Sequence, residues 1–401
     1  MTERDIPKSL PKVVGASTLA VHGGEPHVRA GRSITPPVVL ASTYPFPDTA
    51  ELVAFMEGSF ARPHEYGRYG NPTVQAVEAK LAALEHAEAA LLLSSGMAAI
   101  TTTLLAMVKS GQHVVLTDDV YRKTRVFARQ MLTRFGIQID VVAPNVSAIE
   151  AALRPNTRVV FTESPTNPYL RIVDLEALCQ LARARRINTV IDATFATPIN
   201  MQPLGVGVDL VIHSTTKYLG GHNDLLGGVV LGAAKMIEAI REHLGTLGGI
   251  LDPLSAYLLF RGLKTLALRV ERQNASAQRL AHVLETHAKV ERAWYPTLDS
   301  HPDRALAAKY LRGGGGVVSF ELRGGLEAGT KFVDALEIPL LAASLGGVES
   351  LVEQPALMSY FELSPHERSA IGIREGLVRL SVGIENIEDL ERDVLQALES
   401  C

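Results

Sequence analysis

The stretch that decides the fold is DLVIHSTTKYLGGHND, residues 209–224. It begins with a short apolar run, residues 210–212, whose length and composition are typical of a buried strand. Hydroxyl side chains follow at once, including Ser214 and Thr216, and then comes Lys217. A lysine beside a buried strand loses hydration, which lowers the pKa of its amine and favours a nucleophilic role. The stretch therefore predicts a strand of a buried sheet with a reactive amine at its carboxyl end.

Similar strand candidates recur on both sides of this stretch, from about residue 75 to residue 255. The others are AALLLS (89–94), HVVLTD (113–118), IDVVAP (139–144), RVVFTES (158–164), NTVIDAT (188–194) and GGVVLG (227–232). Helical patterns lie between most of them, such as TVQAVEAKLAALEHA (73–87) and LEALCQLARARR (175–186). Short apolar strands that alternate with helices predict an α/β fold, with a mostly parallel sheet covered by helices on both faces.

Two further parts flank this sheet, which we assign to a large domain of residues 61–255. Prolines and short polar segments dominate residues 1–60 and predict an extended arm with little core of its own. A long helical stretch, roughly residues 255–285, opens residues 256–401, which we predict to form a smaller α+β domain. Its strand candidates are GGVVSFEL (315–322) and GLVRLSVG (376–383).

Bulk composition is typical of a globular protein and excludes some partners. The 401 residues exceed the ~100–200 of one typical domain, and 47% hydrophobic residues suffice for a large core. The net charge is −4 and no lysine- or arginine-rich run occurs, so we expect no nucleic-acid partner. Two cysteines, Cys179 and Cys401, cannot form a disulfide framework, which fits the reducing cytoplasm.

We also expect no secretory signal and no membrane partner. The first residues, MTERDIPKSLPK, carry charges and prolines and contain no apolar stretch. Residues 89–108 contain no charge and match a membrane span in length, but "SSG" and three threonines interrupt them. They predict a buried strand, a turn and a buried helix instead.

Candidate site residues follow several strands, where ligands bind in open α/β sheets. In "SSGM", the amides of Gly96 and Met97 could bind a phosphate at a helix start, and Asp192 ends another strand. Each residue alone has a structural explanation: a helix cap, a surface turn, or, for Lys217, a solvated lysine. Together they supply a lysine for a Schiff base, an anion cradle and an acid for a ring nitrogen, which a pyridoxal phosphate site needs. We expect no metal site.

The chain resembles the Cys/Met metabolism family of pyridoxal-phosphate enzymes over nearly its whole length, from about residue 18 to residue 386. The motifs that carry the resemblance stand in the family's order: YGRYGNPT (66–73), SSGMAAI (94–100), ESPTNP (163–168), DLVIHSTTKYLGGHND (209–224) and SLGGVESLVEQPA (344–356). Three other stretches look most like plant-type cystathionine γ-synthase: DDVYRKTRVF (118–127), TLGGILDP (246–253) and QPALMSYFEL (354–363).

The resemblance implies a type I, aspartate aminotransferase-like fold and assigns roles around pyridoxal 5'-phosphate. Lys217 would bind the cofactor covalently and move protons, Asp192 would bond to the ring nitrogen, and Tyr121 would stack on the ring. The remaining cofactor contacts would come from Ser214, Thr216, Gly96, Met97 and Asn167, and from Tyr66 and Arg68 of a neighbouring subunit. The resemblance also implies a homotetramer, a dimer of dimers with shared active sites.

Arg379 would bind the α-carboxylate of an amino-acid substrate, with Ser344 nearby. The strand pattern supports this role, because apolar residues alternate with Arg379 and Ser381 in residues 376–383. A lone strand arginine is more often part of a surface ion pair, but its forked guanidinium suits a carboxylate.

The sequence departs from the family at two places near the substrate. Many relatives carry glutamate before "SLGG", where this chain has Ala343, and glycines after the stacking tyrosine, where it has Arg122 and Lys123. The spacing of Arg122 with Arg125 and Arg129 predicts one solvated helix face. Lys123 lies off that face and could contact an anionic leaving group of the substrate, or pack its stem on the helix.

The activity implied by the resemblance is replacement at Cγ of an O-activated homoserine by cysteine, giving cystathionine. The donor could be the succinyl, acetyl or phospho ester. Alternatives with the same cofactor are an O-acylhomoserine sulfhydrylase and a cystathionine or methionine γ-lyase. A nicotinamide-dependent oxidoreductase is disfavoured because no GxGxxG follows an early strand. A binding protein with an inactive site is a further alternative.

Overall fold

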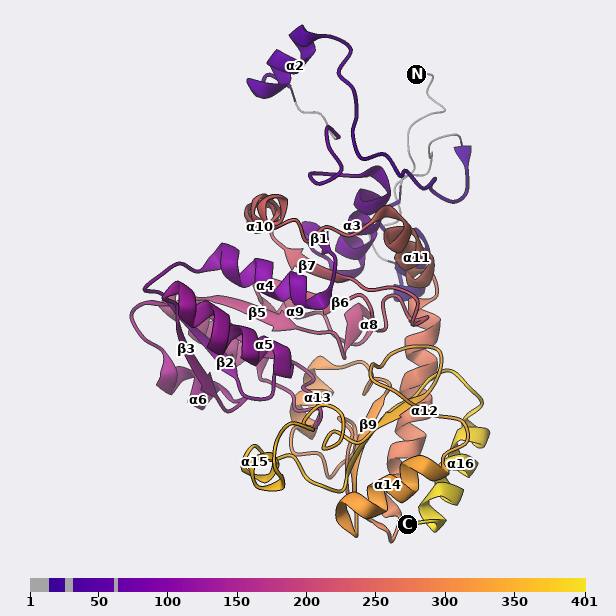
Figure 1. Cartoon of the computed structure of the whole chain (residues 1–401). Coiled ribbons are helices and arrows are strands. Elements are labelled where there is room, and N and C mark those ends of the chain that lie inside the picture. The colour runs from indigo at the N-terminus through magenta and orange to yellow at the C-terminus, as the bar shows by residue number, and fades with distance from the viewer. Residues whose placement is uncertain (1–13, 26–31, 61–63) are drawn as a thin grey trace.

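The computed structural model describes residues 14–25, 32–60 and 64–401 (Figure 1). Residues 1–12, for which we expect no secretory signal, lie outside the described residues. Two sheets lie one above the other along the molecule, and the long helix α12 (Leu266–Thr286) runs beside the second of them (Figure 1). Within these residues, no helix is long and apolar enough to cross a membrane.

The large sheet has the order β1-β7-β6-β5-β4-β2-β3 among the described strands. Its strands are β1 (Ala89–Leu93), β2 (His113–Thr117), β3 (Gln138–Val142), β4 (Thr157–Glu163), β5 (Asn188–Asp192), β6 (Leu210–Ser214) and β7 (Gly228–Gly232). The run from β6 to β3 is parallel, and β7 is antiparallel to both β1 and β6. The α/β class, the mostly parallel sheet and all the predicted strands of this region are confirmed.

Helices cover both faces of this sheet, which explains why its strands are apolar throughout. Along β6, Leu210 and Ile212 join a core with α4 and α10, whereas Val211 joins a second core with α6 and α7. Polar contacts fix both ends of the strand. Asp209 accepts hydrogen bonds from the backbone N–H (2.7 Å) and hydroxyl (2.9 Å) of Thr189, and buried His213 pairs with buried Glu85 (Nε2–Oε2 3.0 Å).

The helices of the described chain follow in sequence order. They are α1 (Ala16–His22), α2 (Thr49–Met56), α3 (Pro72–Glu85), α4 (Gly96–Met107), α5 (Arg122–Val126), a π-helix (Phe127–Met131), a 3₁₀ helix (Leu132–Phe135), α6 (Val146–Ala152), α7 (Leu175–Arg185), α8 (Thr197–Asn200), α9 (Pro203–Val206), α10 (Ala234–Leu247), α11 (Pro253–Leu263), α12, α13 (Arg304–Tyr310), α14 (Gly325–Ala335), α15 (Pro365–Ala370) and α16 (Ile387–Glu399).

The second sheet has the order β10-β11-β12-β9-β8 among the described residues. Its strands are β8 (Val290–Trp294), β9 (Val317–Leu322), β10 (Leu340–Leu341), β11 (Leu351–Glu353) and β12 (Leu377–Ser381). The two predicted strands, β9 and β12, are confirmed, whereas β8, β10 and β11 escaped prediction. One hydrophobic cluster joins α3 and α11 of the first half to β9 and α14 of the second. The division of the chain at residues 60 and 255 stays a prediction.

Buried contacts anchor the described part of the amino-terminal segment to the body, and Lys80 makes several of them. Lys80 of α3 is fully buried, and its Nζ donates to the carbonyl oxygens of Ala20 and Val21 (3.0 Å each) and pairs with Glu25 (2.6 Å). Farther along the chain, α2 stands away from the body (Figure 1) and contains no buried residue. Helix α2 therefore contributes no residue to a core, and the extended arm of residues 1–60 stays a prediction.

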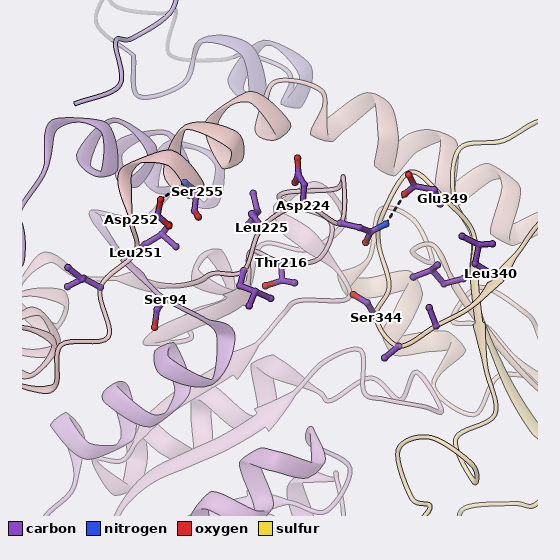
Figure 2. Close-up of a pocket in the computed structure, with 16 residues that line it drawn as sticks. Ser94, Thr216, Asp224, Leu225, Leu251, Asp252, Ser255, Leu340, Ser344 and Glu349 are labelled. Carbon is purple, nitrogen blue, oxygen red and sulfur yellow. Dashed lines mark hydrogen bonds between the residues drawn. The ribbon is translucent and has the colours of Figure 1, made fainter. Parts of the chain in front are cut away.

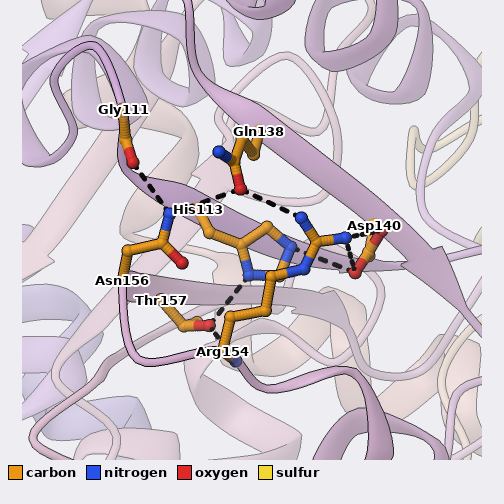
Figure 3. Close-up of polar contacts among 7 residues, drawn as sticks. All are labelled: Gly111, His113, Gln138, Asp140, Arg154, Asn156 and Thr157. Atoms are coloured by element: carbon orange, nitrogen blue, oxygen red, sulfur yellow. Dashed lines mark hydrogen bonds and ion pairs between the residues drawn. The ribbon is translucent and has the colours of Figure 1, made fainter.

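A polar network ties together the amino ends of β2, β3 and β4 (Figure 3). Buried His113 contacts the hydroxyl of Thr157 through Nδ1 (2.8 Å) and Asp140 through Nε2 (3.3 Å). Arg154 donates to both carboxylate oxygens of Asp140 (2.8 and 2.7 Å) and to Oε1 of Gln138 (2.9 Å). The network connects three parallel strands at the edge opposite their carboxyl ends.

His113 should contribute stability that is lost in acid. Burial, followed by the positive charge of Arg154, lowers the pKa of His113. As the pH falls, the unfolded chain therefore takes up a proton near pH ~6.5, before the folded chain does. The contribution is complete above that pH and is lost as the pH falls through the folded pKa.

We expect His113→Gln to lower the free energy of unfolding at neutral pH by about 1–3 kcal/mol, since it disturbs a buried hydrogen bond. Between about pH 7 and pH 5 the variant should lose stability less steeply than the wild type. Urea titrations across this range measure both quantities. Parallel pH dependences of the two proteins would contradict the assignment.

Candidate active site

A cavity of about 450 Å³ lies at the carboxyl ends of the parallel strands. Eleven of the predicted site residues line it: Gly96, Met97, Tyr121, Lys123, Asn167, Asp192, Ser214, Thr216, Lys217, Ser344 and Arg379. A more open hollow of about 920 Å³ adjoins it and shares Thr216 and Ser344 (Figure 2). This outer hollow is lined by the acidic residues Asp224, Asp252 and Glu349 (Figure 2).

Lys217 is held between the two halves of the chain. Its Nζ donates to Oγ of Ser344 at 2.7 Å. Burial, and then the positive charge of Arg379, lowers the pKa of Lys217 to about 8, while the negative charge of Glu353 opposes them. An amine with this pKa is partly unprotonated near neutral pH, so it can act as a nucleophile or a base. Ser344 has φ 106°, a strained conformation for a residue other than glycine.

Asp192 and Glu163 form a pair of neighbouring carboxyl groups on β5 and β4. Oδ1 of Asp192 accepts hydrogen bonds from the N–H (3.0 Å) and hydroxyl (2.6 Å) of Thr194, while burial raises its pKa. Burial, together with the charge of Asp192, raises the pKa of Glu163 further, although it accepts the N–H of Tyr121 at 2.8 Å. Asp192 is therefore the member of the pair better able to hold a negative charge. Glu163 and Thr194 fall in ESPTNP (163–168) and NTVIDAT (188–194), but neither was predicted as a site residue.

The start of α4 forms the predicted anion cradle. Oγ of Ser95 accepts the N–H of Ala98 at 3.0 Å and caps the helix. The amides of Gly96 and Met97 have no acceptor within the helix. Glycine at 96 also allows close approach of Ser214, since a Cβ there would lie 2.9 Å from the Cβ of Ser214. Amides and a hydroxyl thus converge where a phosphate can bind.

Thr216 is also near this cradle, but its hydroxyl has partners already. It accepts the N–H of Gly227 at 3.0 Å and contacts the carbonyl oxygen of Gly227 at 3.3 Å. A phosphate could take its proton only if the longer of these two contacts were given up.

Arg379 lies on the small-sheet side of the cavity, as predicted for a carboxylate-binding residue. Nη1 donates to Oδ1 of Asn167 and Nη2 to the carbonyl oxygen of Ser344, both at 3.1 Å. Glu353 is a third partner, and its Oε1 lies 3.0 Å from Nη1. Glu353 lies in SLGGVESLVEQPA (344–356) but was not predicted as a site residue, because nothing marked its segment as a strand beside β12.

The expectation for the helix after Tyr121 is partly wrong. Lys123 lines the cavity as proposed, but so does Arg122, which we expected in solvent. Arg122 donates to the carbonyl oxygen of Ser359 at 3.2 Å and pairs with Glu362. The regular helix ends after five residues and continues as a π-helix, so the spacing that predicted one solvated arginine face does not persist.

Tyr66 and Arg68 do not line the cavity of their own chain. Both follow the arm, where the Arg68 guanidinium lies 5.5 Å from the ring centre of Tyr66 and 5.1 Å from that of Tyr69. The Tyr66 and Tyr69 rings are about half exposed. Their role toward a neighbouring subunit stays a prediction.

The residues of the cavity fit pyridoxal phosphate. The helix start at Gly96 offers unpaired amides for its phosphate, and Asp192 offers a buried carboxylate for its ring nitrogen. Lys217 provides an amine whose pKa is already lowered. These three features surround one cavity, although they come from three different strand ends.

The rate at which cofactor-free protein takes up pyridoxal phosphate should rise with pH and level off above about pH 8, because the free amine of Lys217 reacts. Arg379→Gln removes a positive charge that lowers the pKa of Lys217. The pH at which the uptake rate reaches half its maximum should therefore move upward. Stopped-flow absorbance measures both. A midpoint near 10.5, the ordinary lysine value, would show that burial does not act on Lys217.

Borohydride should fix the cofactor on Lys217, and Lys217→Ala should bind it without fixation. Turnover should fall by at least roughly 10²–10⁴, the usual range for a general acid–base group. Peptide mapping identifies the reduced lysine. Fixation on another residue, such as Lys264, would refute the assignment.

Comparisons with known proteins agree with this site. A family model described as "Cys/Met metabolism PLP-dependent enzyme" matches residues 17–399. Cystathionine gamma-synthase 1, chloroplastic, from Arabidopsis thaliana is 50% identical over 390 residues, which cover 96% of this chain and 69% of that protein. L-methionine gamma-lyase from Pseudomonas putida is 42% identical over 392 residues, or 97% of this chain and 98% of that protein.

A solved structure extends the likeness to the fold. The crystal structure of metB from Corynebacterium glutamicum matches with a TM-score of 0.91 at 39% identity, and the match covers 98% of this chain and 99% of that one. The predicted resemblance, the type of fold and the cofactor, pyridoxal 5'-phosphate, are thereby confirmed. The chain belongs to the family of Cys/Met metabolism PLP-dependent enzymes.

Proposed function

We propose that the enzyme replaces the γ substituent of an O-activated homoserine with cysteine and so makes cystathionine. The observation that carries the proposal is the distribution of positive charge in the cavity. Arg379 enters from the small sheet, and Lys123 and Arg122 enter from α5 on the large sheet. An amino acid with an anionic γ substituent has two negative groups. Its α-carboxylate can bind Arg379 on one side of the cavity, and its γ substituent can bind Lys123 and Arg122 on the other.

The residues have distinct tasks in this reaction. Pyridoxal phosphate, when bound, supplies an electron sink for the charge left at Cα of the substrate. Arg379 binds the α-carboxylate, and Lys217 removes the proton from Cα and returns it at the end. Asp192 holds a proton at the ring nitrogen. A second proton then leaves Cβ, and its bonding electrons form the Cβ–Cγ double bond as the leaving group departs from Cγ with its own electron pair. The thiol of cysteine adds at Cγ and gives up its proton, and a proton returns to Cβ.

Two alternatives share the cofactor and the first steps. An O-acylhomoserine sulfhydrylase would use sulfide in place of cysteine, and a γ-lyase would need no thiol acceptor. Ala343 lines the cavity where many lyases, and also bacterial γ-synthases, carry glutamate, which argues against a lyase. The identity of 50% to a cystathionine γ-synthase, against 42% to a methionine γ-lyase, supports the same choice.

Product analysis separates these candidates. The holoenzyme is incubated with the succinyl, acetyl and phospho esters of homoserine, each with cysteine, with sulfide and without a thiol. We expect cystathionine with cysteine as the main product. Homocysteine formed faster from sulfide would indicate a sulfhydrylase, and 2-oxobutanoate with ammonia in the absence of a thiol would indicate a lyase.

Lys123 should distinguish among the donors. Its amine can form a charged hydrogen bond, worth roughly 1.5–3 kcal/mol, to a phosphate or succinate but not to neutral acetate. Lys123→Met should therefore lower kcat/KM about 10- to 150-fold for the anionic donors and much less for the acetyl donor. Lys235→Met, at an exposed position on α10, controls for the loss of charge. Equal losses for all donors would show that Lys123 does not contact the leaving group.

We further propose a cytoplasmic homotetramer, arranged as a dimer of dimers in which Tyr66 and Arg68 reach the cofactor phosphate of a neighbouring subunit. Both residues are exposed just after the arm, which supports a partner surface. Both cysteines are free, which fits a reducing compartment. The relative from Arabidopsis thaliana is named as chloroplastic.

A further inference from the structure

Glu353 is the nearest charged neighbour of Arg379. It ends β11 directly opposite Arg379 on β12, and both side chains line the cavity. Glu353 is 3% exposed and Arg379 is 5% exposed, and Oε1 lies 3.0 Å from Nη1. A buried guanidinium without a counter-ion is costly, so this carboxylate stabilises Arg379 when no substrate is present.

The contact between the two groups is incomplete. Oε1 of Glu353 has no directed hydrogen bond in the described chain, and neither has Nε of Arg379. The other contacts of the guanidinium are to two neutral oxygens, those of Asn167 and Ser344. A carboxylate that bonded Arg379 through two parallel N–H groups would satisfy it better. The existing pair therefore leaves room for an incoming carboxylate at Arg379.

An incoming carboxylate would also meet the negative charge of Glu353. Like charges brought together in a desolvated site disfavour binding strongly. A ligand that carries an ammonium group beside its carboxylate offsets this repulsion, whereas a plain carboxylate does not. The same carboxylate opposes the effect of Arg379 on Lys217, so its charge acts across the site.

We propose that Glu353 is a resident counter-ion of Arg379 that makes the cavity select α-amino acids over carboxylates without an ammonium group. The inference rests on the proposed function insofar as Arg379 binds the α-carboxylate. It adds a residue that determines which class of carboxylate is admitted.

The test compares two ligands that differ only in the ammonium group, L-homoserine and 4-hydroxybutanoate. Their dissociation constants are measured by calorimetry on the borohydride-reduced holoenzymes of the wild type and of Glu353→Gln, in which the cofactor is fixed to Lys217 and the amine of a ligand cannot react with it. The variant should bind 4-hydroxybutanoate about tenfold more tightly or better, since one like charge is removed at close range. Affinity for L-homoserine should change by less than about threefold, because loss of repulsion and loss of attraction nearly cancel.

Glu321→Gln is the matched control. It removes one negative charge from the same sheet and breaks the pair of Glu321 with Arg374 (3.4 Å), which lies outside the cavity. Its two dissociation constants should equal those of the wild type. If Glu353→Gln does not fold, Glu353→Ala gives the same comparison. Failure of both variants to yield folded holoenzyme would overturn the proposal, because the pair would then serve the fold rather than the choice of ligand.

An equal gain in affinity of Glu353→Gln for both ligands, or no change in either dissociation constant, would also overturn the proposal. Weaker binding of both would mean that Glu353 merely positions Arg379. Because binding is measured without turnover, these outcomes are separate from a failure of the γ-replacement assay. A second pair, L-alanine and propionate, repeats the comparison without assuming a homoserine donor.

Discussion

The structure depends on burying the amine of Lys217 while still providing it with a hydrogen-bond partner. Burial alone would favour a neutral amine at the cost of hydrogen bonding. The amine donates a hydrogen bond to the hydroxyl of Ser344 (Nζ–Oγ 2.7 Å), and the opposite charges of Arg379 and Glu353 act on it from the other sheet. The two halves of the chain must therefore stay in register with each other. The hydrophobic cluster that runs from α3 to α14 supplies that connection.

The chemistry lies at one edge of the large sheet because parallel strands place all their carboxyl ends there. Asp192, Ser214 and the start of α4 come from separate strands but reach one cavity. At the amino ends of the strands, the polar groups of His113, Asp140 and Arg154 bind one another instead. The polar groups at one end of the parallel strands thus line a cavity, whereas those at the other end bind each other.

Much of this could be predicted from the sequence, for physical reasons that also explain the misses. Fully apolar strands between helices leave a clear pattern, and the lysine and acid stand directly at their ends. The three-residue strand β11 leaves no pattern, so Glu353 could be found only through its register with Arg379. The arginine face after Tyr121 failed because the spacing argument assumes a continuous α-helix, which a π-helix replaces at Phe127. The buried position of Lys80 depends on the carbonyl oxygens of Ala20 and Val21, which are distant in sequence and leave no local pattern.

The double-sided burial of β6 has a consequence for how its position is specified. A strand that is apolar on both faces would lose little hydrophobic contact if it slipped by one residue. Such a slip would nevertheless turn Ser214 and the approach to Lys217 toward the opposite face of the sheet. The contacts of Asp209 with Thr189 and of His213 with Glu85 hold the two ends of β6 and forbid that slip. In this strand, polar contacts rather than hydrophobic packing determine the register with the neighbouring strands. A substitution at one of these contacts, remote from the cavity, would misplace Lys217 and leave the hydrophobic core intact.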